Sequence, residues 1–183
     1  MTASQLSDLF RQIGDGSIGG QEMQAMIEHR NPWEKPKLFD AGSLVSVGPL
    51  TKRFDPKSFF RTREGLYVWN DMSQVLEHAT PTDAADASML GYANLSRNAY
   101  DREIKAELPE NHEVELWHIA ELIKAQPGGK DGLLLNNGYA NIFYVGGFAV
   151  HVYWSADDRG WFVNGWALGG GRWGAGSRVF SRN

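Results

Sequence analysis

Cysteine is absent from this chain of 183 residues. Its absence excludes disulfide bonds, thiolate zinc sites, iron–sulfur clusters and a cysteine nucleophile. Secreted chains of this size often carry disulfides, so we expect a reducing compartment and a cytoplasmic location. The N-terminal sequence MTASQLSDLFRQIGDG places Asp8 and Arg11 where a signal peptide has its apolar run, so we expect no signal peptide.

Long apolar runs and an excess of basic residues are also lacking. No stretch approaches 18 consecutive apolar residues, so we expect no membrane-spanning segment and no membrane partner. The 18 basic and 22 acidic side chains give a net charge of −4, which argues against general affinity for nucleic acids. The hydrophobic share of 42% and the charged share of 22% suit a globular fold, and the length suits one domain with a small appendage.

Residues 1–31 are predicted to form a helical hairpin. Apolar side chains recur at helical spacing over 4–13 and again over 20–29, and the glycine-rich turn GDGSIGG separates the two segments. Two prolines in NPWEKPK then interrupt regular structure. We therefore assign 32–54 to a linker or strap, with a possible short strand at 43–47.

Residues 55–183 are predicted to form the main α+β domain. Glycine and tryptophan concentrate in its last third, which has the alternating pattern of antiparallel strands. The stretch 80–100 shows no clear period and receives no assignment. The predicted elements are helices at 56–62, 72–79 and 112–126 and strands at 66–69, 140–145, 147–154, 161–168 and 178–181. We expect these helices to pack on a C-terminal antiparallel sheet, rich in Trp and Gly, or on a small open barrel.

The best candidate for a functional surface is the hairpin over 147–168. The turn SADDRG, closed symmetrically, pairs Trp154 with Trp161 and His151 with Asn164. Because strand side chains alternate, one face is then apolar and faces the core, while the other face is mixed. The mixed face carries His151, Tyr153, Phe162, Asn164 and Trp166.

Two interpretations of that mixed face stay open. Aromatic rings can stack on a ligand and a histidine can titrate near neutral pH, so the face is predicted to be a binding surface, extended by Arg172 and Arg178. Alternatively, the helix over 112–126 covers the face, and His151 bonds to Asn164 inside the protein. A one-residue slip in register would exchange the two faces of the hairpin.

Three segments, GLYVWND, LLNNGYANIFYV and RVFSRN, resemble a group of uncharacterised bacterial proteins. The resemblance covers most of the chain apart from 80–100. It implies one recurring bacterial domain, and it carries over no activity, cofactor or catalytic residue.

Signatures of common enzymes and nucleotide sites are missing or incomplete. No G-x-S-x-G, H-E-x-x-H or Walker sequence occurs. Gly169, Gly171 and Gly174 match G-x-G-x-x-G. A dinucleotide loop leads into a helix, however, and here a strand is predicted to follow. We therefore predict no cofactor.

Only one group of side chains has the spacing of a metal site. Glu115, His118 and Glu121 include the Glu-x-x-His spacing of metal sites in helical bundles. These residues are predicted to face outward, opposite the apolar stripe of their helix. The sequence therefore predicts no metal ligands.

The sequence favours a non-enzymatic intracellular binding or interaction module whose partner is a protein or a small ligand. Its density of Trp, Tyr and Arg is typical of interfaces. The first alternative is a hydrolase-type enzyme with His151 as the general base. The second is nucleic-acid binding through the C-terminal arginines and tryptophans, which the net charge does not favour.

Overall fold

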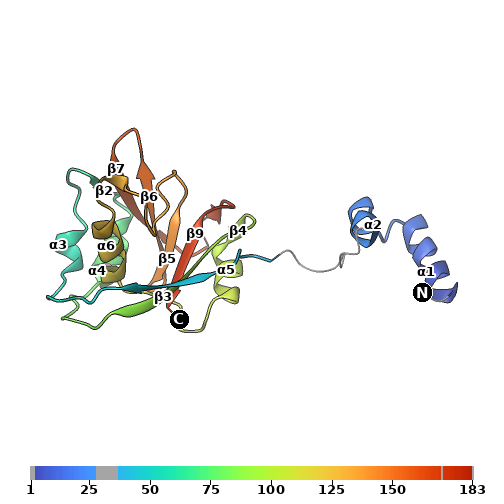
Figure 1. Ribbon diagram of the computed structural model, residues 1–183, viewed down its shortest axis with the longest axis horizontal. Coiled ribbons are helices and arrows are strands. Elements are labelled where there is room, and N and C mark those ends of the chain that lie inside the picture. Colours follow the sequence, from blue (N-terminus) through green and yellow to red (C-terminus); the bar gives the residue numbers. More distant parts are fainter. Residues whose placement is uncertain (1–2, 28–36, 170, 183) are drawn as a thin grey trace. The chain divides into compact units, whose positions relative to one another are not determined.

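The chain forms two compact units, Met1–Pro36 and Lys37–Asn183, in a computed structural model (Figure 1). The structure describes residues 3–27, 37–169 and 171–182. The prolines that predict a linker lie outside these described residues. No helix in the described part of the chain is long and apolar enough to cross a membrane.

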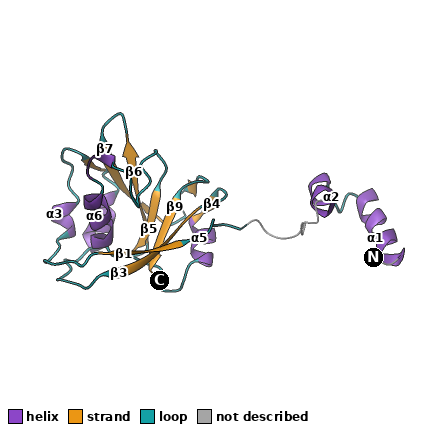
Figure 2. Cartoon of the chain, viewed as in Figure 1, coloured by secondary structure: helices purple, strands orange, loops and turns teal. Residues whose placement is uncertain are grey.

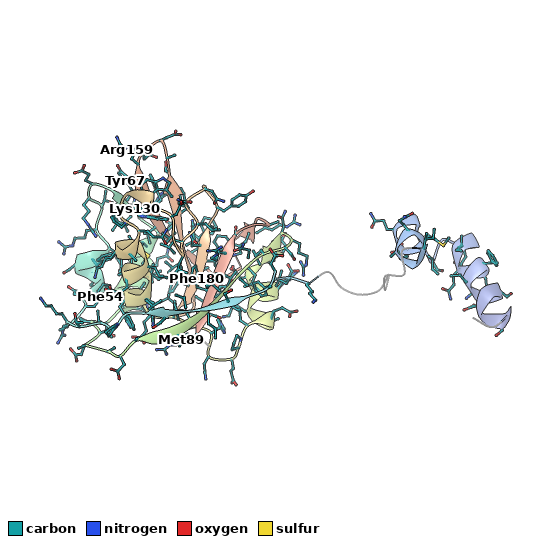
Figure 3. All side chains as sticks on the ribbon, viewed as in Figure 1. Phe54, Tyr67, Met89, Lys130, Arg159 and Phe180 are labelled. Atoms are coloured by element: carbon teal, nitrogen blue, oxygen red, sulfur yellow. The ribbon has the colours of Figure 1, made fainter. Side chains whose placement is uncertain are left out.

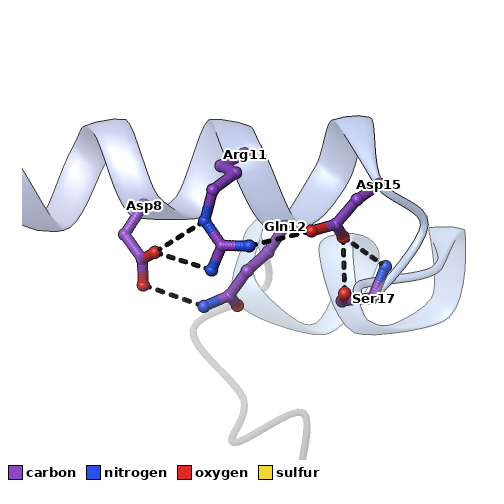
Figure 4. A network of polar contacts seen from close by, with 5 residues as sticks. All are labelled: Asp8, Arg11, Gln12, Asp15 and Ser17. Atoms are coloured by element: carbon purple, nitrogen blue, oxygen red, sulfur yellow. Dashed lines mark hydrogen bonds and ion pairs between the residues drawn. The ribbon is translucent and has the colours of Figure 1, made fainter.

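The first unit contains two helices, α1 (Ala3–Gly14) and α2 (Gly20–Ile27), in agreement with the predicted helical spacing. Arg11 links the helical turns on either side of it. Its guanidinium bonds to Asp8 and to Asp15, at 2.9 Å in each case, as Figure 4 shows. Ion pairs as exposed as these contribute little to the stability of a helix.

The second unit is built on a seven-stranded sheet in the order β1-β3-β9-β5-β6-β7-β2, which confirms the predicted α+β class. The strands of this sheet are β1 (Ser43–Val47), β2 (Leu66–Val68), β3 (Ser88–Asn94), β5 (Asn141–Val145), β6 (Phe148–Ser155), β7 (Gly160–Ala167) and β9 (Arg178–Arg182). A separate two-stranded sheet joins β4 (Ala99–Tyr100) to β8 (Arg172–Trp173). The large sheet is open, with β1 and β2 as its edge strands.

The sheet is mixed, whereas the sequence predicts an antiparallel one. β5, β6 and β7 do pair antiparallel, but β2 runs parallel to β7 and β9 runs parallel to β5. Parallel neighbours need long connections. Here β9 lies between β3 and β5, although β6, β7 and β8 separate it from β5 in the sequence. No local sequence pattern predicts a pairing between strands so far apart in the chain.

The helices lie on both faces of the sheet. They are α3 (Pro56–Phe59), α4 (Met72–His78), α5 (Asp101–Glu107) and α6 (Leu116–Ala125), with a 3₁₀ turn over Pro127–Gly129. Figure 2 shows α3 and α6 on one side of the strands and α5 on the other. As predicted, α3 begins at the Asp-Pro pair. Asp55 caps the helix, since its side chain accepts a hydrogen bond from the backbone N–H of Lys57, and Pro56 is the first helical residue.

Both faces of the sheet are buried, in two separate hydrophobic clusters. The larger cluster lies under α3, α4 and α6, and within it Phe180 stacks on Phe143, with ring centroids 4.7 Å apart. The smaller cluster contains Ile104 of α5 together with Ile142 and Tyr144 of β5. The central strands are therefore covered on both sides.

Residues 37–54 belong to the second unit, whereas the sequence predicts a linker or strap there. The possible short strand at 43–47 is β1 of the large sheet. Leu50 and Phe54 are buried in the larger hydrophobic cluster. The sequence does not indicate this packing, because most members of the cluster that Leu50 and Phe54 join come from residues 66–180, far along the chain.

Gly165 lets α4 approach β7 closely, which gives the first prediction. A Cβ atom at this position would meet Val75 Cγ2 at 2.4 Å and Met72 Sδ at 3.3 Å. We expect Gly165→Ala to lower the free energy of unfolding by about 1–3 kcal/mol, because the tightly packed helix must shift. Gly174→Ala is the matched control, since a Cβ atom there meets nothing within 4 Å. Urea denaturation measures both variants, and equal stability of the two would contradict this packing.

Candidate functional site

The structure confirms the predicted register of the β6–β7 hairpin. Trp154 pairs with Trp161, and His151 pairs with Asn164. The apolar face of the hairpin packs in the larger cluster together with the residues of α6. The alternative in which the helix over 112–126 covers the His151 face is therefore wrong, since that helix lies against the opposite face.

The aromatic side chains of the mixed face stack on one another. The Phe162 ring lies between Tyr153 and Tyr67, with centroid distances of 5.1 Å and 4.8 Å and interplanar angles of 15° and 22°. These distances match the spacing of neighbouring strands, so the rings stand upright on the sheet. Phe162 is thus covered on both flat faces, and it covers one face each of Tyr153 and Tyr67. Tyr67 joins this row through the parallel β2–β7 pairing, which the sequence analysis did not predict.

His151 is buried at the end of this aromatic row. Its exposed fraction is 6%, and its ring centroid lies 4.4 Å from that of Trp166 and 5.3 Å from that of Trp173. Nδ1 has no hydrogen-bond partner among the described residues, while the side chain of Asn164 accepts from the N–H of Gly165. Burial lowers the pKa of His151 to about 4, so the ring is neutral at pH 7 and is a weak base.

The two arginines predicted to extend this surface lie in different environments. Arg178 is half-buried and bonds to the Asn94 side chain at 2.9 Å and to the Leu133 carbonyl at 2.6 Å. Arg172 is exposed, and its guanidinium lies 6.0 Å from the ring centroid of Tyr100. Arg178 thus has internal partners, and the arginines do not form one basic surface.

A buried carboxyl group that the sequence analysis missed lies on the same side of the sheet. Asp101, 3% exposed, accepts hydrogen bonds from Tyr144 Oη at 3.1 Å, from Trp173 Nε1 at 2.7 Å and from the N–H of Gly169 at 3.0 Å. Burial, followed by the charge of Asp101, raises the pKa of Tyr144 above its ordinary value. The three donors come from distant segments, so Asp101 joins α5, β5, β8 and the loop after β7.

A cavity of about 360 Å³ opens on the other side of the molecule, beside α4 and α6. We call it the α4–α6 cavity. Its lining residues are Pro56, Val75, His78, Ala79, Thr80, Thr82, Glu113, Val114, Glu115, Leu116, Val145, Gly146, Phe148 and Arg182. It therefore brings together a histidine, two carboxylates and an arginine that lie far apart in the sequence.

Glu113 is held in a fixed position in this cavity. Its two carboxylate oxygens accept hydrogen bonds from the N–H groups of Gly146 and Gly147, at 3.0 Å and 3.2 Å. Both donors belong to the tight turn between β5 and β6, where the two glycines have positive φ angles of 55° and 82°. The turn that glycine permits thus presents two N–H groups to one carboxylate.

Arg182 and His78 add positive charge and a hydrogen-bond acceptor to the cavity. Nη2 of Arg182 lies 2.7 Å from the Glu115 carboxylate, whereas Nε and Nη1 have no hydrogen-bond partner in the described part of the chain. The His78 Nδ1 atom lies 3.0 Å from the carbonyl oxygen of Gln74. A carbonyl only accepts, so Nδ1 carries a proton, and Nε2 is the ring nitrogen that can accept a hydrogen bond.

The start of α6 differs from the prediction. The helix begins at Leu116 rather than at 112, because the N–H of Glu115 donates to Nδ1 of His118 at 3.0 Å and caps the helix there. His118 is fully buried and stacks on Trp117, with ring centroids 3.8 Å apart. The prediction that Glu115, His118 and Glu121 all face outward is thus wrong for His118. All five residues from Leu116 to Ala120 are buried, so the first turn of α6 has no polar face.

No group of three or more His, Asp or Glu side chains is arranged to hold a metal ion within residues 3–27, 37–169 and 171–182. His118 Nδ1 is already the acceptor for the helix cap. Burial lowers the pKa of His118 to about 4, against the opposing effect of the Glu115 charge.

The Asp101 network gives a prediction about stability. Asp101→Asn puts an amide donor where three donors already converge, so we expect the free energy of unfolding to fall by about 2–4 kcal/mol. Tyr144→Phe removes only one of the three hydrogen bonds, and we expect a loss of about 1 kcal/mol. Chemical denaturation at pH 7 measures both variants. Equal losses would show that the three bonds do not act as one network.

The two buried histidines predict that the protein loses stability in mild acid. Because the folded-state pKa values of His118 and His151 lie near 4, the unfolded chain takes up their protons first as the pH falls below 6.5. We expect each histidine to remove about 2 kcal/mol of the free energy of unfolding between pH 7 and pH 5. Urea midpoints of His118→Asn, His151→Asn and the double variant at both pH values test this. An unchanged pH dependence in the double variant would contradict it.

Comparison with protein-family models, with curated proteins and with solved structures finds no match for this chain.

Proposed function

We propose that the protein binds a free amino acid with an apolar side chain in the α4–α6 cavity. The observation that carries this proposal is that charges of both signs and apolar side chains line the same cavity. The predicted class, a binding module for a small ligand, is kept. The predicted surface on the β6–β7 hairpin is not favoured, because its aromatic rings are engaged with each other.

Glu113 is suited to receive the ammonium group of such a ligand. Its carboxylate is oriented by the backbone of Gly146 and Gly147 before any ligand arrives. A preorganised group loses little conformational freedom on binding, which favours affinity. The Nε2 atom of His78 offers a second acceptor on the wall of the same cavity.

Arg182 is suited to receive the carboxylate group. Its ion pair with Glu115 holds the guanidinium in place through Nη2. Nη2 has a second N–H, which together with Nε or Nη1 leaves one edge of the guanidinium for a carboxylate, and arginine commonly binds carboxylates through two parallel hydrogen bonds along such an edge.

Apolar side chains of Val75, Val145 and Phe148 also line the cavity. A volume of about 360 Å³ falls within the range of small-molecule sites, which combine apolar walls with a few placed polar groups. An aliphatic side chain would gain about 25 cal/mol for each Å² that it buries there.

The arrangement favours binding over catalysis. Glu113 accepts from two backbone N–H groups and Glu115 is paired with Arg182, so in the described part of the chain neither carboxylate is hydrogen-bonded to a histidine ring or a hydroxyl group that it could activate. The hydrolase alternative depends on His151, whose pKa near 4 makes it a weak base at neutral pH. A cytoplasmic setting and a relation to the bacterial group stay predictions from the sequence.

Isothermal titration calorimetry with L-leucine tests this proposal. We expect saturable binding to the full chain, and at least tenfold weaker binding of 3-methylbutylamine and of 4-methylvalerate, which each lack one of the two charged groups. Glu113→Gln is expected to weaken leucine binding about tenfold but to leave the binding of 4-methylvalerate unchanged.

Arg182→Lys keeps the positive charge, loses the planar fork and should also weaken leucine binding. Arg172→Gln, an exposed arginine outside the cavity, is the matched control and should bind like the wild type. The absence of saturable leucine binding to the wild-type chain, or equal binding by all variants, would overturn the proposal.

A further inference from the structure

The two edges of the large sheet differ in how they are protected. β2 has only three residues, and charged side chains precede it in Arg63 and Glu64. β1 has five residues and pairs with β3 on one side only, among the residues that the structure describes. Such an edge presents a row of backbone groups that another strand can pair with.

The β1 edge also lacks the features that usually prevent strand pairing. The segment AGSLVSVGPL, residues 41–50, contains no charged side chain. On the outer face, Leu44 is 56% exposed and Met89 of the neighbouring strand is 47% exposed. Figure 3 shows Met89 at the periphery of the second unit. Edge strands are commonly protected by lysine, proline or a bulge, and none of the three occurs within β1.

We propose that two copies of this chain associate through their β1 strands, paired antiparallel about a two-fold axis at Val45. This centre gives the longest possible overlap, because all five residues of each strand are paired. Ser43 then lies opposite Val47 of the second copy, and Leu44 lies opposite Ser46 of the second copy. Without charges in the segment, the strand does not repel its own copy.

The side chains on the outer face support a second copy as the partner. Within one copy Ser46 pairs with Met89, and both are on the same face as Leu44. In the pair of chains, the small Ser46 of one copy lies between its own Met89 and Leu44 of the other copy. The two exposed apolar side chains can therefore meet over Ser46, and the two-fold axis repeats this contact. Each copy thus covers the apolar surface that the other exposes.

The inner face fits the same arrangement. Val45, half-buried beside the larger cluster, would lie opposite Val45 of the second copy, and β-branched pairs are favourable across strands. Pairing of five residues is smaller than a standard interface, so the dimer should dissociate on dilution. No β1 residue lines the α4–α6 cavity, so this inference does not depend on the proposed function.

Sedimentation velocity of the full chain over a range of concentrations tests the association. We expect a dimer at high concentration and a monomer on dilution. Leu44→Lys places like charges beside the paired strand and should shift the midpoint of dissociation at least tenfold higher in concentration. Leu168→Lys, another exposed leucine at 37%, is the matched control and should behave like the wild type. A wild-type chain that stays monomeric at all concentrations would overturn the proposal.

Cysteine cross-linking tests the register, because the natural chain contains no cysteine. Val45→Cys should form a disulfide-linked dimer on mild oxidation, since opposite Cβ atoms lie about 4.5–5.5 Å apart. Ser43→Cys should not, because the two copies of position 43 would lie roughly 14 Å apart along the strands.

If Val45→Cys lowers stability, the double variant L44C/S46C can be cross-linked in its place. Both positions are exposed, and position 44 of one copy lies opposite position 46 of the other across the two-fold axis. Cross-linking at position 43 as fast as at 45, or no cross-linking by either the position-45 or the double variant, would contradict the pairing.

Discussion

The antiparallel pairing of β6 with β7 is the constraint on which the second unit depends. Its register assigns Val152 and Val163 to the core under α4 and α6, and it places His151 and Tyr153 on the opposite face. A shift of one residue would exchange every side chain between an apolar core and a mixed aromatic surface. The close packing of α4 on β7 also needs this register, because Gly165 then lies on the face that contacts Met72 and Val75. The two hydrophobic clusters, one on each face of the sheet, therefore both depend on the register of this hairpin.

The α4–α6 cavity follows from the same arrangement at the other end of these strands. The β5–β6 turn needs positive φ at Gly146 and Gly147, and the N–H groups that this turn presents hold Glu113. The cap of α6 at Glu115 and the ion pair to Arg182 fix the opposite charge nearby. The carboxylate of Glu113 and the guanidinium of Arg182 are thus held by different partners, beside apolar side chains. This arrangement suits the proposed ligand, which has one positive and one negative charge.

Local features of the fold could be predicted from the sequence, and long-range ones could not. The β6–β7 register and its two faces follow from one turn and strict alternation, and the start of α3 follows from an Asp-Pro pair. β3 was not predicted because Gly91, Ala93 and Asn94 have weak strand propensity. Its pairing with β1 on one side and β9 on the other stabilises it instead. The residues of the mixed face of the hairpin are predicted correctly, but the ring stacking between strands depends on β2, which the sequence does not connect to the hairpin. His78, Glu113 and Arg182 line the cavity from three distant segments of the chain. They come together only when the whole sheet is assembled, so the sequence alone does not predict this site.

The proposed function requires a zwitterionic ligand to occupy the α4–α6 cavity. A titration of the ¹⁵N-labelled chain with L-leucine, followed by two-dimensional NMR, detects such a ligand residue by residue. We expect shifts of the backbone amides of Gly146 and Gly147, whose N–H groups bond to Glu113, and of the Arg182 side-chain Nε signal. Shifts confined to the hairpin amides of Tyr153 and Phe162, or no shift at any leucine concentration, would contradict it.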